Sequence, residues 1–323
     1  MDRGLTLEFV RITEAAALNS AKWMGKGDKI KADDAAVMAM RSMFDTMDIN
    51  AKVVIGEGEM DEAPMLYIGE HLGKGGGELL EIAVDPLEGT ELVAKGMPGA
   101  IAVMAVAPEN GLLHAPDMYM EKICVGPRAK GCIDIDASVT DNVTRVAAAL
   151  GKSVEDLTVV ILDRQRHERQ IEELRKAGAR VRLITDGDVS PAVAAALPET
   201  GIDMMIGRGG APEGVIAAAA LKALGGDMQA RLWAENPDEL RRVKEMGIKD
   251  IDHVLKLDDL VRTDDVVFTA TGITDSELLA GVRFNSKCAV TNTLVIRGAS
   301  GTVRFIEANH YYETKPKYVK MEG

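Results

Sequence analysis

The stretch TVVILDRQRHERQIEELRKAGARVRLI, residues 158–184, decides the fold class. Residues 158–162 form a short apolar run that predicts a strand, residues 168–177 predict a helix, and residues 180–184 predict a second strand. A strand, a helix and another strand in this order form the repeating unit of α/β proteins. We therefore predict an α/β protein built of layered sheets and helices.

Strand and helix patterns alternate along most of the remaining chain. Further helices are predicted over residues 7–21, 34–44 (with Asp33 as its N-cap), 138–150, 190–197 and 212–224. Further strands are predicted over residues 52–55, 79–84, 101–107, 118–125, 203–206, 266–270, 289–297 and 302–308. The last two strands should form a hairpin around Ser300 and Gly301. A change of pattern near residues 136–141 suggests a lobe boundary there, and the last two strands with the tail form a further C-terminal part, so that the chain divides approximately into residues 1–137, 138–285 and 286–323.

The composition excludes some classes of partner. The chain has 323 residues, of which 46% are apolar, so it can bury a sizeable core. Lys and Arg number 38 against 51 Asp and Glu, which gives a formal net charge of -13. Nucleic acids and anionic membranes repel such a surface, so neither is expected as a partner. An anionic small substrate stays compatible where cations or a local basic pocket supply the missing charge.

The cysteines and the N-terminal segment indicate a compartment. Cys124, Cys132 and Cys288 are widely spaced and form no C-x-x-C motif, which indicates reduced thiols. Residues 1–14 carry several charged side chains in place of the apolar core of a signal peptide. No run of residues approaches the length of a membrane span. We therefore expect a cytoplasmic protein.

Acidic residues stand out at the end of one predicted strand. The segment DPLEGT, residues 85–90, follows the strand at 79–84 and places Asp85 and Glu88 three residues apart. The carboxyl ends of strands are where the sites of α/β proteins lie, and oxygen ligands of this kind suit Mg²⁺ or Mn²⁺. From the spacing alone, a solvated turn followed by a helix N-cap is an equal interpretation.

Three other acidic positions also have both a metal-binding and a structural interpretation. Glu57 opens a run of four carboxylates in residues 57–62, which repel one another unless they are solvated or bridged by cations. Asp33 fits a capping role equally well. The helix dipole alone favours Glu213 just behind Pro212. The glycines before Glu213 would let backbone amides converge on an anion such as phosphate.

Basic and polar residues follow two other predicted strands. Arg164 and Arg166 could hold a phosphate in bidentate geometry, or could belong to a surface cluster paired with Glu168. The segment Asp186-Gly187-Asp188 could accept hydrogen bonds from sugar hydroxyls, or could cap the next helix. Tyr119 lies within a predicted strand, where packing is its simplest role.

Taken in order, these motifs resemble a known family. DPLEGT resembles the D-P-[LIV]-[DE]-G-[TS] signature of the metal-dependent, lithium-sensitive sugar phosphatases. Over nearly its whole length the chain resembles the class II fructose-1,6-bisphosphatases of bacteria. The segments that carry this resemblance are SAKWMGKGDK (20–29), VIGEGEMDEAPML (54–66), DGDV (186–189) and GGAPEG (209–214). The resemblance implies a layered α-β-α-β-α fold and hydrolysis of the 1-phosphate of D-fructose 1,6-bisphosphate in gluconeogenesis.

The resemblance also implies roles for individual residues. It implies two or more Mn²⁺ or Mg²⁺ ions per site, held by Asp33, Glu57, Asp85, Glu88 and Glu213. It implies a substrate-binding set made of Glu88, Gly89, Thr90, Tyr119, Arg164, Gln165, Arg166, Asp186, Gly187, Asp188 and Gly210. Residues 1–137 would form the metal-binding catalytic lobe, 138–285 the sugar-phosphate-binding lobe, and 286–323 a C-terminal hairpin and tail. Gln165 stands where the family commonly has Pro. The family further implies a homo-oligomer, either a dimer or a tetramer.

These groups suggest a mechanism as a hypothesis. Thr90 orients a metal-activated water for in-line attack, and Asp61 accepts its proton. Arg164 and Arg166 hold the 6-phosphate, which positions the reacting phosphate. Two alternatives stay open. One is activity on sedoheptulose 1,7-bisphosphate or on inositol phosphates, and the other is a catalytically silent, metal-dependent sugar-phosphate-binding protein.

Overall fold

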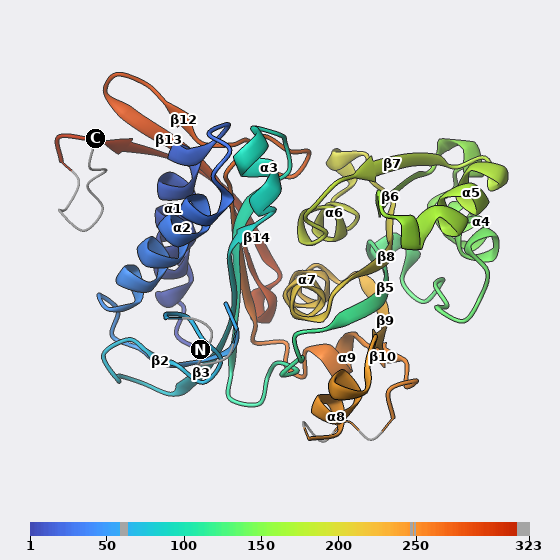
Figure 1. Cartoon of the computed structure of the whole chain (residues 1–323), viewed down its shortest axis with the longest axis horizontal. Coiled ribbons are helices and arrows are strands. Elements are labelled where there is room, and N and C mark those ends of the chain that lie inside the picture. The colour runs from blue at the N-terminus through green and yellow to red at the C-terminus, as the bar shows by residue number, and fades with distance from the viewer. Residues whose placement is uncertain (59–63, 246–247, 249, 315–323) are drawn as a thin grey trace. The chain divides into compact units, whose positions relative to one another are not determined.

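The computed structural model of the chain describes residues 1–58, 64–245, 248 and 250–314 (Figure 1). The chain divides into two compact units. The first unit comprises residues 1–112 and the described residues from 265 onward, and the second comprises residues 113–264. Each unit has its own mixed sheet and its own helices, which confirms the α/β class. The three functional lobes predicted from the sequence stay a prediction.

The first unit is built on an eight-stranded sheet. Its strand order is β12-β13-β11-β4-β3-β1-β2, and β14 pairs with β13. These strands are β1 (Asn50–Ile55), β2 (His71–Leu72), β3 (Leu79–Glu88), β4 (Ile101–Pro108), β11 (Val267–Gly272), β12 (Arg283–Phe284), β13 (Cys288–Arg297) and β14 (Thr302–Tyr311). The predicted hairpin around Ser300 and Gly301 is confirmed, because β13 and β14 pair antiparallel along their whole length.

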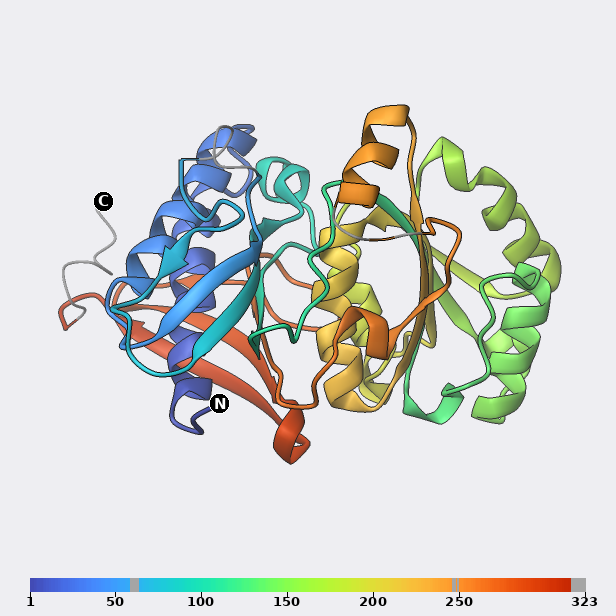
Figure 2. The same cartoon turned by 90° about the horizontal axis from the view of Figure 1, so that it is seen from below.

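Two long helices cover one face of this sheet, α1 (Leu5–Ser20) and α2 (Lys29–Phe44) (Figures 1 and 2). The prediction that Asp33 caps the second helix is wrong. Asp28 is the N-cap, and its side chain accepts a hydrogen bond from the Lys31 N–H at 3.1 Å. The earlier start adds a helical turn that carries Ala32, which is fully buried, so the longer helix removes more apolar surface from water.

The second unit is built on a six-stranded sheet of order β10-β9-β5-β8-β6-β7. Its strands are β5 (Tyr119–Val125), β6 (Thr158–Leu162), β7 (Arg180–Ile184), β8 (Met204–Gly210), β9 (Asp227–Trp233) and β10 (Leu255–Lys256). β6 is parallel to β7 and β8, whereas β5 is antiparallel to β8 and β9. The strand–helix–strand unit predicted over residues 158–184 is confirmed, with α5 (Glu168–Ala177) between β6 and β7.

Helices cover both faces of the second sheet. α4 (Val139–Leu150) and α5 lie on one face, and α6 (Val189–Ala194) and α7 (Ala211–Leu224) lie on the other (Figure 1). Sequence patterns did not predict β9, β10, α8 (Pro237–Glu245) or α9 (Leu257–Leu260). The strand predicted at 203–206 continues to Gly210, because β8 pairs with β5 through its glycine-rich end.

Residues 21–23 and 90–95 add a short 3-10 helix after α1 and the short helix α3 (Thr90–Lys95) after β3. Among the described residues, no helix is both long enough and apolar enough to cross a membrane.

Candidate functional site

The first cluster of acidic side chains lies at the end of β3. The strand continues to Glu88, so the prediction that it ends before Asp85 is wrong. Its pairing with β4 shifts register there, since Asp85 lies opposite Val103 and Glu88 lies opposite Ile101. Three steps along β3 therefore match two steps along β4, which is the pattern of a β-bulge.

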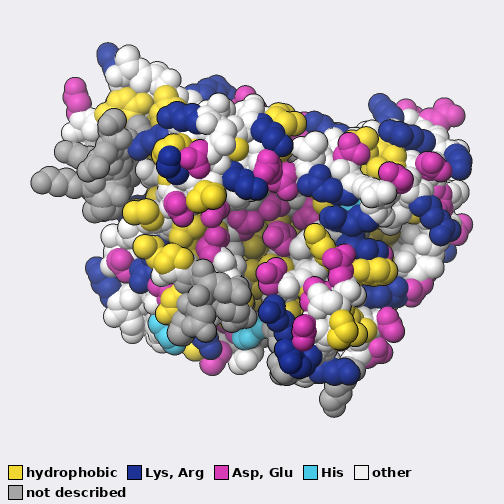
Figure 3. Space-filling view, in the orientation of Figure 1, with side chains coloured by type: hydrophobic (Ala, Val, Ile, Leu, Met, Phe, Trp, Pro, Cys, Tyr) yellow, Lys and Arg dark blue, Asp and Glu magenta, His cyan; other side chains and the backbone are white. Residues whose placement is uncertain are grey.

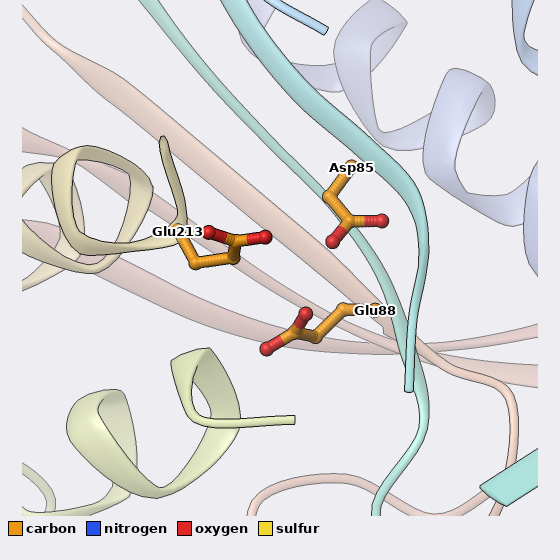
Figure 4. Close-up of side chains that lie close together, drawn as sticks. All are labelled: Asp85, Glu88 and Glu213. Carbon is orange, nitrogen blue, oxygen red and sulfur yellow. The ribbon is translucent and has the colours of Figure 1, made fainter. Parts of the chain in front are cut away.

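The bulge brings two carboxylates to the same side of the strand. Pro86 has no N–H for the ladder, and the Leu87 N–H donates to Oδ1 of Asp85 at 3.0 Å. In a regular strand, residues three apart point to opposite faces. Here carboxylate oxygens of Asp85 and Glu88 lie within 4.8 Å of each other, and both side chains leave the ribbon on one side (Figure 4). Two oxygens held in this way suit a hard divalent cation.

Gly89 makes the turn from β3 into α3. Its φ is 90°, in the left-handed region, and a Cβ at this position would lie 2.9 Å from Cδ1 of Leu92. Glycine is the residue that adopts this conformation without steric cost. The turn makes Thr90 the first residue of α3, two residues beyond Glu88. A predicted catalytic hydroxyl thus follows directly on the carboxylate pair.

The other acidic residues predicted in the first unit are placed less closely. Asp33 lies half-buried within α2, and burial, followed by the charge of Asp34, raises the pKa of Asp33 to about 6. Glu57 follows β1, and its N–H donates to the Leu66 carbonyl at 3.1 Å. Neither belongs to a group of three or more closely spaced carboxylates within the part of the chain that is described. The predicted proton acceptor, Asp61, lies outside the described residues.

Arg166 and Tyr119 meet in the second unit. The guanidinium of Arg166 lies over the ring of Tyr119, 4.7 Å from the ring centroid, and donates to the Arg208 carbonyl at 3.0 Å from Nη2. Arg164 is half-buried, and Gln165 is exposed at the first position of a 3-10 turn. A residue at that position needs no N–H for the turn, so Gln165 occupies it as readily as the Pro of the resembling family.

His167 fixes the loop of residues 163–167, here called the arginine loop, to the sheet. Its Nδ1 donates to the Leu162 carbonyl, and its Nε2 accepts from the Arg208 N–H, both at 2.8 Å. This pattern requires the neutral ring with the proton on Nδ1. Burial, aided by the charges of Arg166 and Arg208, lowers the pKa of His167. The imidazole therefore ties the loop between β6 and α5 to the middle of β8.

Positive side chains gather where this loop lies, although the chain as a whole is acidic. In the space-filling view, Lys and Arg side chains are concentrated over the region of β6 and β8 (Figure 3). Arg208 adds to the set, since its guanidinium stacks on the Trp233 ring at 3.4 Å and pairs with Glu121 at 3.1 Å. A local excess of guanidinium groups is what an anionic substrate requires from a protein with net charge -13.

Two carboxylates fold against the glycines at the end of β8. A Cβ on Gly209 would lie 1.8 Å from Oδ2 of Asp188, and a Cβ on Gly210 would lie 1.7 Å from Oε2 of Glu213. The glycines therefore make room for carboxylates, whereas the sequence suggested that they open the backbone to an anion. Glu213 stands in the first turn of α7, directly after Pro212 (Figure 4).

These two carboxylates each have one buried oxygen, Oε2 of Glu213 and Oδ2 of Asp188, that accepts no hydrogen bond among the described residues. Burial raises the pKa of Glu213, whereas Oδ2 of Asp188 lies 2.8 Å from the ammonium of Lys122. Asp188 is buried at the start of α6, but its side chain makes no capping hydrogen bond to that short helix. The capping interpretation of Asp188 is therefore not supported. Asp186 and Gly187 precede it in the loop from β7, with φ of 73° at Gly187.

Sequence reasoning missed Lys122, which faces Asp188. The side chain of Lys122 is only 1% exposed, and its Nζ lies 2.8 Å from each oxygen of Asp188 and 3.0 Å from the Gly210 carbonyl. Lys122 shares one face of β5 with Met120 and Cys124, both fully buried. In an alternating strand, every second residue faces the core, and Lys122 occupies one of these otherwise apolar positions. This lysine among core-facing residues was the signal that could have identified it.

Comparisons with known proteins agree with these motifs. The family model for bacterial fructose-1,6-bisphosphatase, glpX-encoded, matches residues 3–310. The chain is 50% identical to the fructose-1,6-bisphosphatase class 2 of Haemophilus influenzae over 334 aligned residues, covering 99% of this chain and 100% of that protein. It is 49% identical to the fructose-1,6-bisphosphatase 1 class 2 of Escherichia coli, covering 98% of this chain and 97% of that protein.

Among solved structures, the chain is similar to an extragenic suppressor from Pyrococcus furiosus, with a TM-score of 0.30 and 13% identity. That match covers 60% of this chain and 69% of the other. It is too weak to support any argument about fold or function.

Proposed function

Because the chain belongs to the bacterial, glpX-encoded fructose-1,6-bisphosphatase family, we propose that it hydrolyses the 1-phosphate of D-fructose 1,6-bisphosphate to give fructose 6-phosphate and phosphate. The reaction would serve gluconeogenesis. The observation that carries this proposal is the sequence identity of 49–50% that the chain shares with relatives named for this activity, over almost their whole length. The carboxylate pair on the β3 bulge supplies matching chemistry within the chain itself.

The donor set fits a hard divalent cation. Asp85 and Glu88 offer two carboxylate oxygens from one rigid bulge, and Glu213 carries a buried oxygen without a hydrogen-bond donor among the described residues. We propose that these three residues, with Asp33 and Glu57, hold two or more Mn²⁺ or Mg²⁺ ions. Such ions, when bound, neutralise phosphate charge and lower the pKa of a coordinated water.

The remaining residues bind, orient and move a proton. Thr90 orients the attacking water, and Asp61 accepts its proton. Asp186 and Asp188 accept hydrogen bonds from sugar hydroxyls, and Gly89, Gly187 and Gly210 belong to the same substrate-binding set. The cation–π contact of Arg166 with Tyr119 preorganises that guanidinium for a phosphate.

The 6-phosphate would be held on the arginine loop. Arg164 and Arg166 flank Gln165 on this loop, and His167 fixes the loop to β8. A distal phosphate bound to a fixed loop positions the reacting phosphate, because the substrate loses its rotational freedom before the chemical step.

Phosphate release tests the activity. We expect metal-dependent release from fructose 1,6-bisphosphate with Mn²⁺ or Mg²⁺, and much less from sedoheptulose 1,7-bisphosphate or inositol 1-phosphate. Turnover of only one of the other substrates would leave the carboxylate site standing and refute the assignment of the arginine loop. No release from any of them with either metal would favour a binding protein.

Two further proposals concern the protein in the cell. We propose a cytoplasmic protein, in line with the free thiols of Cys124 and Cys288, both buried, and of Cys132. We also propose a homo-oligomer, a dimer or a tetramer. Light scattering on the eluted protein measures the mass directly, and a value near the chain mass of 34.6 kDa would contradict the second proposal.

A further inference from the structure

One buried ammonium group joins two of the segments assigned to the substrate. Nζ of Lys122 lies 2.8 Å from both oxygens of Asp188 and donates to the Gly210 carbonyl at 3.0 Å. The two segments leave different strands, since Asp188 follows β7 and Gly210 ends β8. Lys122 itself lies on β5, which pairs along its length with β8 and β9. A side chain on this interior strand is a fixed point for both loops.

Asp188 is confined from a second direction. Its Oδ2 lies where a Cβ of residue 209 would be, at 1.8 Å, so only glycine leaves room for the carboxylate. The Asp188 side chain is 5% exposed, and its Oδ1 accepts the Lys122 hydrogen bond while Oδ2 lies at the same distance from the ammonium. Lysine on one side and a bare glycine on the other leave this carboxylate a single position.

We propose that Lys122 is a positioning residue for substrate binding, which holds the ionised carboxylate of Asp188 where the sugar hydroxyls of the substrate meet it. This rests on the proposed function of the Asp186–Asp188 loop. Lys122 touches no reacting atom. It acts through Asp188, whose charge it balances in a buried position where an unpaired carboxylate is costly.

The test replaces the charge and keeps the length of the side chain. With Lys122→Met, the KM for fructose 1,6-bisphosphate should rise at least tenfold, and kcat should change less than threefold, since the substitution affects binding of the sugar and not the attacking water. The matched control is Lys222→Met on α7, a lysine of the same unit that is 12% exposed and pairs with Asp258. That variant should keep both constants within twofold.

A double variant shows whether Lys122 acts through Asp188. Asp188→Asn alone should also raise KM at least tenfold. In Lys122→Met/Asp188→Asn the pair is neutral, and its KM should equal that of Asp188→Asn. A further tenfold rise in the double variant would overturn the proposal, as would a folded Lys122→Met protein with the wild-type KM.

Two more measurements keep the proposal testable when Lys122→Met does not fold. The neutral double variant avoids an unpaired buried charge, so its KM against that of Asp188→Asn still decides the question. Gly209→Ala leaves every charge in place and displaces the carboxylate, and it should raise KM in the same way. An unchanged KM in a folded Gly209→Ala protein contradicts the confinement of Asp188.

The failure of the proposed function looks different in the same assay. In that case the wild-type protein itself releases no phosphate from fructose 1,6-bisphosphate. The positioning role is then measured on whichever sugar phosphate the wild-type protein hydrolyses or, failing hydrolysis, binds by calorimetry, with the same variants and the same expected ratios.

Discussion

The two units place their acidic side chains by different devices. In the first unit, a bulge at Pro86 turns Asp85 and Glu88 to one side of β3, and all of the residues involved lie within one short segment. In the second unit, Asp188 and Glu213 fold against Gly209 and Gly210, and a lysine from a third strand faces Asp188.

The difference lies in how the negative charge of the carboxylates is balanced. Two neighbouring carboxylates on a bulge form a ligand pair whose balance a bound cation can supply. A buried carboxylate beside a buried lysine already carries its own counter-ion, so its position and its charge are set by the protein. We therefore propose metal binding for Asp85, Glu88 and Glu213, and sugar binding for Asp188, whose charge Lys122 balances.

The largest expected effect comes from the bulge. Asp85→Asn keeps the shape of the side chain but removes its charge, and it should lower kcat about 10³-fold, equivalent to about 4 kcal/mol of transition-state stabilisation. Glu109→Gln, an exposed change just after β4, is the matched control and should leave kcat unchanged. Steady-state phosphate release measures kcat, and a thermal melt of each variant shows whether it is folded. A fully active Asp85→Asn protein would show that the Asp85 carboxylate on the bulge is not needed for hydrolysis.

The buried pair should dominate stability in the second unit. Lys122→Met leaves the Asp188 carboxylate buried without its partner, which should cost about 3–5 kcal/mol of unfolding free energy. The neutral Lys122→Met/Asp188→Asn variant should recover most of this loss. Urea unfolding gives the values, and Lys222→Met, whose partner Asp258 is 90% exposed, should cost clearly less. Equal losses at the two lysines would show that burial does not distinguish them.

Sequence patterns predicted well what depends on neighbours along the chain. The run from Thr158 to Ile184 gave its strands and helix with the observed bounds, since apolar runs, helix formers and Gly178 act locally. The DPLEGT segment likewise indicated the Asp85 and Glu88 pair, because both carboxylates lie within six consecutive residues. The error at Asp33 was also local, because both Asp28 and Asp33 are suitable caps and the burial of Ala32 favours the longer helix.

What depends on packing between segments far apart in sequence was not predicted. Lys122 and Asp188 are 66 positions apart, and no spacing rule links a strand lysine to a loop aspartate. β9 was missed because buried and half-exposed residues alternate along it. Its sequence therefore mixes polar and apolar residues and has no continuous apolar run. The strand predicted at 203–206 stopped before Gly207 to Gly210, but pairing with β5 continues it through these glycines.

A smaller effect is expected at the turn after the bulge. Gly89→Ala must adopt a φ of 90° with its new Cβ 2.9 Å from Leu92, so it should cost about 1–2 kcal/mol of stability. The strained turn should also displace Thr90 and lower kcat about tenfold, because catalytic groups tolerate little misplacement. Urea unfolding and steady-state kinetics measure both. Unchanged kcat in this variant would show that the turn does not position the Thr90 hydroxyl.

The smallest expected effect is a pH dependence of stability in the second unit. The folded protein holds His167 neutral, with a pKa lowered by burial, because Nε2 accepts the Arg208 N–H and a proton there would break that hydrogen bond. Below the unfolded pKa of 6.5 the unfolded chain binds a proton that the folded chain does not. The unfolding free energy should therefore be constant above pH 6.5 as far as His167 is concerned, and should fall as pH drops below 6.5 toward the folded pKa.

Urea unfolding between pH 5 and pH 8 measures this slope, and His167→Gln provides the comparison. Glutamine does not titrate, so the variant should be less stable at pH 8 but should lose less stability than the wild-type protein between pH 7 and pH 5. Identical slopes would assign the pH dependence to other groups. They would also mean that the hydrogen bond from the Arg208 N–H to Nε2 does not hold the ring neutral in the folded protein.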